Sequence, residues 1–182
     1  MKLFYLILGA TPAGRNIEQH DVFFGIAESL RDLVPHIKSF WPEAKGEIHI
    51  DGWQEVNTVD GFTVSVVPKT DASVEQHLFF INLGGYKPGL FAELHEQHLM
   101  VGNSMSEIVK RVKQTEFYKT MGFKSAESHI DDKYGVDIDD IFRVEDILPQ
   151  EFREKFSIVL EKAAGDFQPN PMKVGYFKLS KL

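Results

Sequence analysis

The feature that most constrains the fold of this chain is an internal repeat, because residues 3–64 share a residue pattern with residues 78–144. The offset between matching residues grows from 75 to 80 positions in small steps, as expected if short insertions fell in loops. Self-similarity of this kind predicts two copies of one supersecondary unit. The matches that carry the repeat are Leu3, Phe4, Leu8, Gly9, Gly14, Glu18 and His20, which recur as Leu78, Phe79, Leu83, Gly84, Gly89, Glu93 and His95, and His49-Ile50-Asp51, which recurs as His129-Ile130-Asp131.

Each copy is expected to fold in the order strand, strand, helix, strand, strand. The first strand is a short and continuously apolar run, which is typical of a strand covered on both faces. A loop rich in Gly and Pro follows it, because these residues are the ordinary punctuation of turns. The predicted strands are 3–8, 22–27, one through His49 and 62–67 in the first copy, and 78–83, 99–102, one through His129 and 141–147 in the second.

The helix of each copy carries one apolar stripe, as expected for a helix that packs on a sheet. In the second copy Ser104 and Glu107 have the spacing of a capping box, and Gly122 is placed to end the helix. In the first copy Pro35 predicts a kink or a split, because proline lacks the N–H that a helix interior requires.

The predicted fold class is α+β, with repeat units at residues 1–68 and 77–148 related by a pseudo-two-fold axis. One helix cannot cover the apolar face of such a sheet, whereas two units can cover each other in one compact body. Residues 149–182 have no counterpart in the repeat and are expected to pack on it. We expect a helix over 149–164 and then an extended tail, in which 174–179 adds an edge strand.

The composition excludes several classes of protein. The 182 residues include no Cys, which excludes disulfides, a thiolate nucleophile and Cys-ligated metals. The net charge is −7 and the basic residues are scattered, so we expect no binding to nucleic acid. No apolar run reaches the roughly 20 residues of a membrane helix. The apolar N-terminal segment resembles a signal peptide, but it recurs internally as a strand, so the prediction is a soluble, cytoplasmic protein.

One set of polar residues occurs in both copies, as a Glu-x-His pair and a His-x-Asp pair. Side chains at positions i and i+2 of an extended segment share one face. If the two segments are neighbours, each copy assembles two imidazoles and two carboxylates. The candidate site residues are therefore Glu18, His20, His49 and Asp51 in the first copy, and Glu93, His95, His129 and Asp131 in the second.

Three uses of this polar set are open. The interpretation we favour is a structural latch, in which a buried imidazole and a carboxylate satisfy each other. Imidazole and carboxylate together also suit a divalent transition metal, which is the one cofactor the sequence suggests. They are equally the groups used for general acid–base catalysis or for ligand binding.

Two other motifs carry less information. Gly9 and Gly14 have the spacing of a phosphate-binding P-loop, but the Lys-Ser/Thr pair that must follow is absent. We therefore expect a strand-to-strand turn there and at the equivalent Gly84–Gly89 segment. The acidic stretch at residues 131–140 lacks the ligand spacing of an EF-hand, so a solvated loop is expected.

Several stretches also carry a family likeness: Ile17-Glu18-Gln19-His20-Asp21-Val22, His49-Ile50-Asp51-Gly52-Trp53, Val59-Asp60-Gly61-Phe62, Leu83-Gly84-Gly85-Tyr86, Glu93-Leu94-His95-Glu96 and His129-Ile130-Asp131-Asp132. With them the chain resembles the bacterial proteins grouped as domain of unknown function 1543. The resemblance covers residues 3–148 and implies a bacterial protein with a duplicated unit. It implies no activity and transfers no catalytic residue.

The function we expect is a binding or assembly module, with another protein or a second copy of the chain as partner. The alternative is a metal-assisted or acid–base hydrolase that uses the repeated Glu-x-His and His-x-Asp residues. An enzyme needs the four groups to converge in a pocket that solvent reaches. A latch leaves them buried and bonded to one another.

Overall fold

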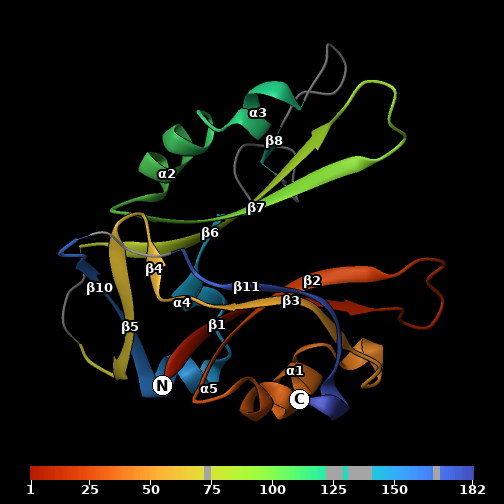
Figure 1. Ribbon diagram of the computed structural model, residues 1–182, viewed down its shortest axis with the longest axis horizontal. Helices are drawn as coiled ribbons and strands as arrows, with labels where there is room; N and C mark the ends of the chain where they lie inside the picture. Colours follow the sequence, from red (N-terminus) through yellow and green to blue (C-terminus); the bar gives the residue numbers. More distant parts are fainter. Residues whose placement is uncertain (72–74, 122–128, 131–140, 166–168) are drawn as a thin grey trace. The chain divides into compact units, whose positions relative to one another are not determined.

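The computed structural model describes residues 1–71, 75–121, 129–130, 141–165 and 169–182, with the backbone alone at 129–130. The protein is an α+β structure of antiparallel sheets and short helices (Figure 1). The chain forms two compact units: unit 1 contains Met1–Ala72 and Ile147–Leu182, and unit 2 contains Ser73–Asp146. The acidic loop expected at 131–140, and Gly122 as the end of a helix, lie outside the described residues.

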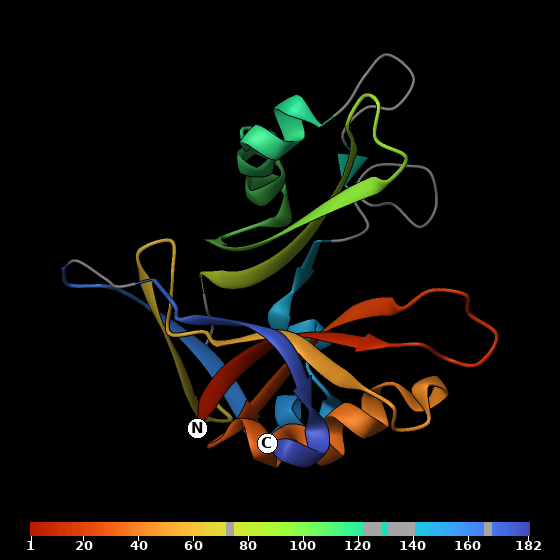
Figure 2. The ribbon, with the colours of Figure 1, turned by 45° about the vertical axis from the view of Figure 1, so that its right-hand side comes forward.

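The larger sheet of unit 1 has four antiparallel strands in the order β11-β3-β1-β2. β1 and β2 form a long hairpin, which Figure 2 shows as two red to orange strands joined by a loop at one end. Leu3, Leu6 and Leu8 on the inner strand are at most 2% exposed, so β1 forms the centre of the core as its apolar sequence predicts. The strands are β1 (Lys2–Ala10), β2 (Gln19–Ala27), β3 (His49–Glu55) and β11 (Met172–Lys178).

The tail strand β11 pairs with β3 at the edge of this sheet, which confirms the edge strand predicted near Val174. Val174 is 82% exposed and Tyr176 is 65% exposed, so this strand presents large side chains to solvent. The tail therefore contributes to the sheet of unit 1.

The second sheet of unit 1 overturns the helix predicted over 149–164. Only α5 (Gln150–Lys155) is helical, and the chain then continues as β10 (Phe156–Lys162). Every residue of β10 pairs with β5 (Phe62–Pro68), which also pairs with the short β4 (Thr58–Val59). The segment contains the β-branched Ile158 and Val159, and sheet pairing overrides the helical pattern there.

The helical segment of unit 1 is split as Pro35 predicts. A 3₁₀ turn, η1 (Leu30–Leu33), passes directly into α1 (Val34–Phe40), and a second turn, η2 (Pro42–Ala44), follows. Pro35 lies in the first turn of α1, where the missing N–H has no intrahelical partner to lose. Leu33 and Ile37 are buried and belong to the hydrophobic core, so this segment packs against unit 1.

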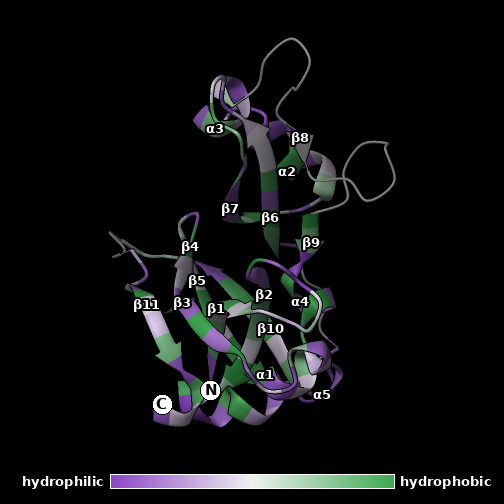
Figure 3. Cartoon of the chain, turned by 90° about the vertical axis from the view of Figure 1, so that its right-hand side faces the viewer, coloured by the Kyte–Doolittle hydropathy of each residue, from purple (hydrophilic) through white to green (hydrophobic). Residues whose placement is uncertain are grey.

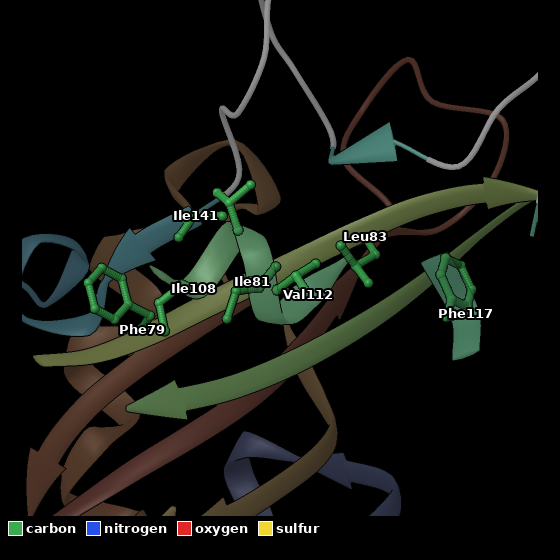
Figure 4. Close-up of a cluster of buried hydrophobic side chains, with 8 residues drawn as sticks. Phe79, Ile81, Leu83, Ile108, Val112, Phe117 and Ile141 are labelled. Atoms are coloured by element: carbon green, nitrogen blue, oxygen red, sulfur yellow. The ribbon is translucent and has the colours of Figure 1, made fainter. Parts of the chain in front are cut away.

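Unit 2 is built around the strand β6, which pairs with β7 on one edge and with β8 and β9 on the other. Figure 4 shows its core, in which Phe79, Ile81 and Leu83 of β6 meet side chains from α2, α3 and β9. The elements are β6 (His77–Tyr86), β7 (Glu93–Gly102), α2 (Met105–Val112), α3 (Glu116–Thr120), β8 (His129–Ile130), β9 (Ile141–Arg143) and α4 (Val144–Ile147).

The single helix expected in the second copy is two helices. The Ser104 hydroxyl accepts a hydrogen bond from the Glu107 N–H at 3.3 Å, as predicted for the start of α2. The Glu107 carboxylate, however, accepts from the Asn103 N–H rather than from Ser104. The break follows from Thr115, whose hydroxyl accepts from the Tyr118 N–H and so caps a new helix, α3.

The strand predicted over 141–147 is also wrong beyond residue 143, where α4 begins. Glu145 and Asp146 occupy the first turn of α4, where acidic side chains favour the positive end of a helix. Val144 and Leu148, four residues apart, are both buried while Asp146 between them is exposed, which is helical rather than strand spacing.

The hydropathy of the chain follows this architecture. In Figure 3 hydrophobic residues are green, and the helix α3 carries purple hydrophilic residues as well, as expected for a helix with one buried face. In the part of the chain that the structure describes, no helix is both long and apolar enough to cross a membrane.

Candidate functional site

Three strands of unit 1 bring the predicted polar residues together. Gly9 on β1 pairs with His20 on β2 and with His49 on β3, so these three residues lie side by side across the sheet. Residues directly opposite each other on neighbouring strands project on the same face. Glu18 immediately precedes β2, so it approaches the same place from the hairpin loop.

Asp51 reaches this place through an irregularity in the sheet. Leu8 pairs with Ile50 and Ile7 pairs with Gly52, which leaves Asp51 as an extra residue on β3. Such a β-bulge redirects a side chain without ending the strand. The four residues Glu18, His20, His49 and Asp51 thus converge, and we call them the His–carboxylate cluster.

The side chains of the His–carboxylate cluster form a ring in which imidazoles and carboxylates alternate. Nε2 of His49 lies 3.0 Å from Oε1 of Glu18 and 3.2 Å from Oδ1 of Asp51. Nε2 of His20 lies 3.2 Å from Oδ2 of Asp51 and 3.5 Å from Oε2 of Glu18. Each carboxylate therefore directs one oxygen toward each imidazole.

The contacts made by two buried atoms of the cluster lack the geometry of a hydrogen bond. Within the described residues, the buried atoms His49 Nε2 and Asp51 Oδ2 have no hydrogen-bond partner. Buried polar atoms are nearly always paired, and an unpaired one calls for an explanation such as a bound ion. As they stand, however, the side chains do not enclose an ion, because no group of three or more His, Asp or Glu in the described part is arranged to hold a metal.

The cluster is buried at one end and open at the other. The His49 side chain is 7% exposed, whereas that of His20 is 52% exposed. The buried end rests on Gly9, where a methyl group would overlap His49 Nε2 and Asp51 Oδ2. Glycine at this position therefore makes room for both side chains.

The C-terminal tail covers the buried end of the cluster. The ring of Tyr176 on β11 lies 4.1 Å from the imidazole of His49, centroid to centroid, with 31° between the planes. A pocket of about 460 Å³ opens beside the cluster, with Glu18, His49 and Tyr176 in its wall. Lys38 and Lys178 also line this pocket. Sequence reasoning missed Tyr176 and the two lysines, since none of them lies in a repeated motif.

The second polar set is described only in part. Gly84 pairs with His95 on β7 and with His129 on β8. Nε2 of His95 lies 4.0 Å from Oε2 of Glu93, and the Asn82 amide nitrogen lies 3.2 Å from Nδ1 of His95. The side chain of His129 and all of Asp131 lie outside the described residues, so convergence of the second set stays a prediction.

Comparisons with known proteins found one family model and one solved structure to which the chain is similar. Residues 15–66 match the family described as Domain of Unknown Function (DUF1543), which confirms the resemblance seen in the sequence. The matched range contains the whole His–carboxylate cluster. No curated protein matches the chain.

A solved structure is similar over nearly the full length. The crystal structure of a protein Il1583 from Idiomarina loihiensis shares 22% sequence identity, with 98% of this chain and 97% of that chain covered and a TM-score of 0.58. At this identity the likeness concerns the fold alone.

Proposed function

We propose that the protein is a binding module whose His–carboxylate cluster holds a divalent transition-metal ion. The observation that carries the proposal is the Nε2 atom of His49, which is buried, has no hydrogen-bond partner among the described residues and faces two carboxylate oxygens. A cation bound between these groups would satisfy all of them at once.

The spacing of the cluster supports a metal. Ligand atoms around a four-coordinate ion, at metal–ligand distances of roughly 2.0–2.2 Å, lie roughly 3.3–3.6 Å from one another. The nitrogen–oxygen distances in the cluster run from 3.0 to 3.5 Å. Turning the carboxylates toward a common point needs rotation about the terminal torsions of Glu18 and Asp51, which are broad in energy. Two imidazoles and two carboxylates suit Zn²⁺, Fe²⁺ or Mn²⁺.

The structural latch is a weaker explanation of the cluster. A latch gains its stability from directional hydrogen bonds, and leaving a buried polar atom without one costs about 1–3 kcal/mol. His49 has carboxylate oxygens within reach and yet makes no such bond through Nε2 in the described part of the chain. A latch also gives no reason why both negative carboxylates, Glu18 and Asp51, contact the half-exposed imidazole of His20.

The pocket beside the cluster favours metal-assisted hydrolysis as a second candidate. Hydrolytic metal sites keep one position open for water. His20 is half exposed, and Glu18 lies in the wall of the pocket, so water reaches the cluster from that side. Hydrolysis of simple phosphate and carboxylate esters by the metal-loaded protein, absent in the chelated protein, would establish this activity.

We also propose that the two units descend from one duplicated unit. The two sheets have equivalent pairings, which supports the duplication. Gly9 pairs with His20 and His49 in one sheet, and Gly84 pairs with His95 and His129 in the other. The last strand differs, since β9 pairs with β6 whereas β5 pairs with β4 and β10. The pseudo-two-fold axis relating the units stays a prediction.

The decisive experiment measures bound metal directly. Elemental analysis of the purified protein is followed by chelation and calorimetric titration with Zn²⁺ and with Mn²⁺. We expect the double variant His20→Ala/His49→Ala to bind one equivalent of metal ion fewer than the native chain does. The matched control is His36→Ala, because His36 in the same unit contacts the Glu151 carboxylate outside the cluster. Unchanged metal binding by the double variant, with lower stability, would establish the latch instead.

A further inference from the structure

The pocket beside the His–carboxylate cluster is lined by two lysines that the metal site alone does not explain. Lys38, near the end of α1, and Lys178, at the end of β11, line it from two separate elements. Neither lysine has an ion-pair partner among the residues that the structure describes. Outside the cluster, Glu47 is the one carboxylate among the described residues of the lining.

A bound divalent ion would change the charge that a ligand meets. Without metal, the carboxylates of Glu18, which lines the pocket, and of Asp51, which contacts the lining residue His49, would repel an anion. A divalent cation cancels these two charges, and the lysines then outnumber Glu47. The loaded pocket is therefore positive, whereas the empty one is not.

The remaining lining suits a ligand larger than a free ion. The volume of about 460 Å³ lies within the range of sites for small organic molecules. The hydroxyls of Thr11 and Ser180 line it and offer hydrogen bonds. The Tyr176 ring adds an aromatic surface next to His49.

We propose that this pocket binds the anionic group of a small organic molecule, a phosphate or a carboxylate, between Lys38 and Lys178 and beside the metal-loaded cluster. The inference rests on the proposed metal site, and it adds the class of ligand. Metal and anion are coupled, since the ion removes the repulsion that the anion would otherwise meet.

The test uses the full chain loaded with one equivalent of Zn²⁺ and desalted, then titrated by calorimetry with inorganic phosphate or with acetate. Chloride at equal ionic strength is the reference, because exposed charges are screened by salt. We expect saturable binding of phosphate or acetate, weaker by about tenfold in Lys38→Ala and in Lys178→Ala. The stronger of the two ligands identifies the anion. Removing the metal should weaken binding by about 5- to 150-fold.

Lys173→Ala is the matched control. Lys173 lies on the same strand as Lys178, but its ammonium group sits 5.0 Å from the Trp53 ring centre, outside the pocket lining. It should bind the anion as the native chain does. Metal content is measured in every sample, so the two proposals fail separately. The anion site alone is overturned if the metal-loaded native protein binds neither anion better than chloride. It is also overturned if both pocket variants bind the anion as tightly as the native protein does. A protein that takes up no metal overturns both.

Discussion

The Nε2 atom of His49 lies 3.0 Å from Oε1 of Glu18, although one residue begins β3 and the other ends the loop before β2. The contact exists because β1 pairs with both strands, so the end of the hairpin and the start of β3 meet beside Gly9. A buried nitrogen is thereby held against a charged oxygen without the geometry of a hydrogen bond. A metal ion bound between these two atoms would satisfy both.

Zinc should stabilise the native chain through the cluster. A ligand that binds only the folded state at 100 times its Kd contributes about 2.7 kcal/mol, or roughly 5–10 °C in Tm for a chain of this size. We expect His49→Ala to lose this gain and His36→Ala to keep it. Differential scanning calorimetry with zinc and with chelator measures both. Equal zinc-dependent shifts in the two variants would contradict a role for His49.

The charge of Glu18 should matter more than that of a neighbouring carboxylate. Glu18 and Glu47 both line the pocket, but only Glu18 contacts the imidazoles of the cluster. Loss of an outer-shell partner typically costs 10- to 100-fold in metal affinity, and loss of a ligand should cost at least about that much. We therefore expect Glu18→Gln to weaken Zn²⁺ binding by about 100-fold and Glu47→Gln to change it little, measured by competition with a chromogenic chelator.

Acidification should release the metal before the protein unfolds. Imidazole nitrogen binds a metal only when it is neutral, so protons compete with the ion for His20 and His49. Affinity should therefore fall as the solution is made more acidic. Bound zinc after desalting at each pH gives the curve, and circular dichroism at the same pH confirms that the fold persists. Metal retained in full at pH 5 would argue against imidazole ligands.

The convergence of the cluster could be predicted from the sequence because it depends on local rules. Alternation predicts that His49 and Asp51 share one face, as do Glu18 and His20, and the repeat marks both pairs because each recurs in the second copy. The bulge at Asp51 could not be predicted, because it depends on how β3 aligns with β1. The pattern of the chain therefore fixes the members of the cluster and not their orientation.

Two features of the C-terminal region escaped prediction for a different reason, although its edge strand was predicted. The segment Phe156–Lys162 carries an apolar pattern that suits a helix or a strand, and its pairing with β5 decides between them. Tyr176 and Lys178 sit in a tail that has no counterpart in the repeat, and only the pairing of β11 with β3 brings them to the pocket. Contacts between segments distant in sequence decide both cases, and a single sequence does not record them.

The last prediction concerns the floor of the cluster. Gly9→Ala places a methyl group where His49 Nε2 and Asp51 Oδ2 now lie, so both side chains must move. Overpacking of this kind costs about 1–3 kcal/mol of stability. We also expect loss of zinc binding, because the displaced atoms are the proposed ligands.

Gly52→Ala is the control for this variant, because a methyl group there would have its nearest neighbours at 3.7 Å, an ordinary contact. Gly52 lies on β3, next to Asp51, so the substitution tests the same strand without crowding the ligands. It should leave zinc binding intact. If Gly9→Ala binds zinc as tightly as Gly52→Ala does, the ion does not sit over Gly9, because no metal could keep His49 and Asp51 as ligands while a methyl group occupies their positions.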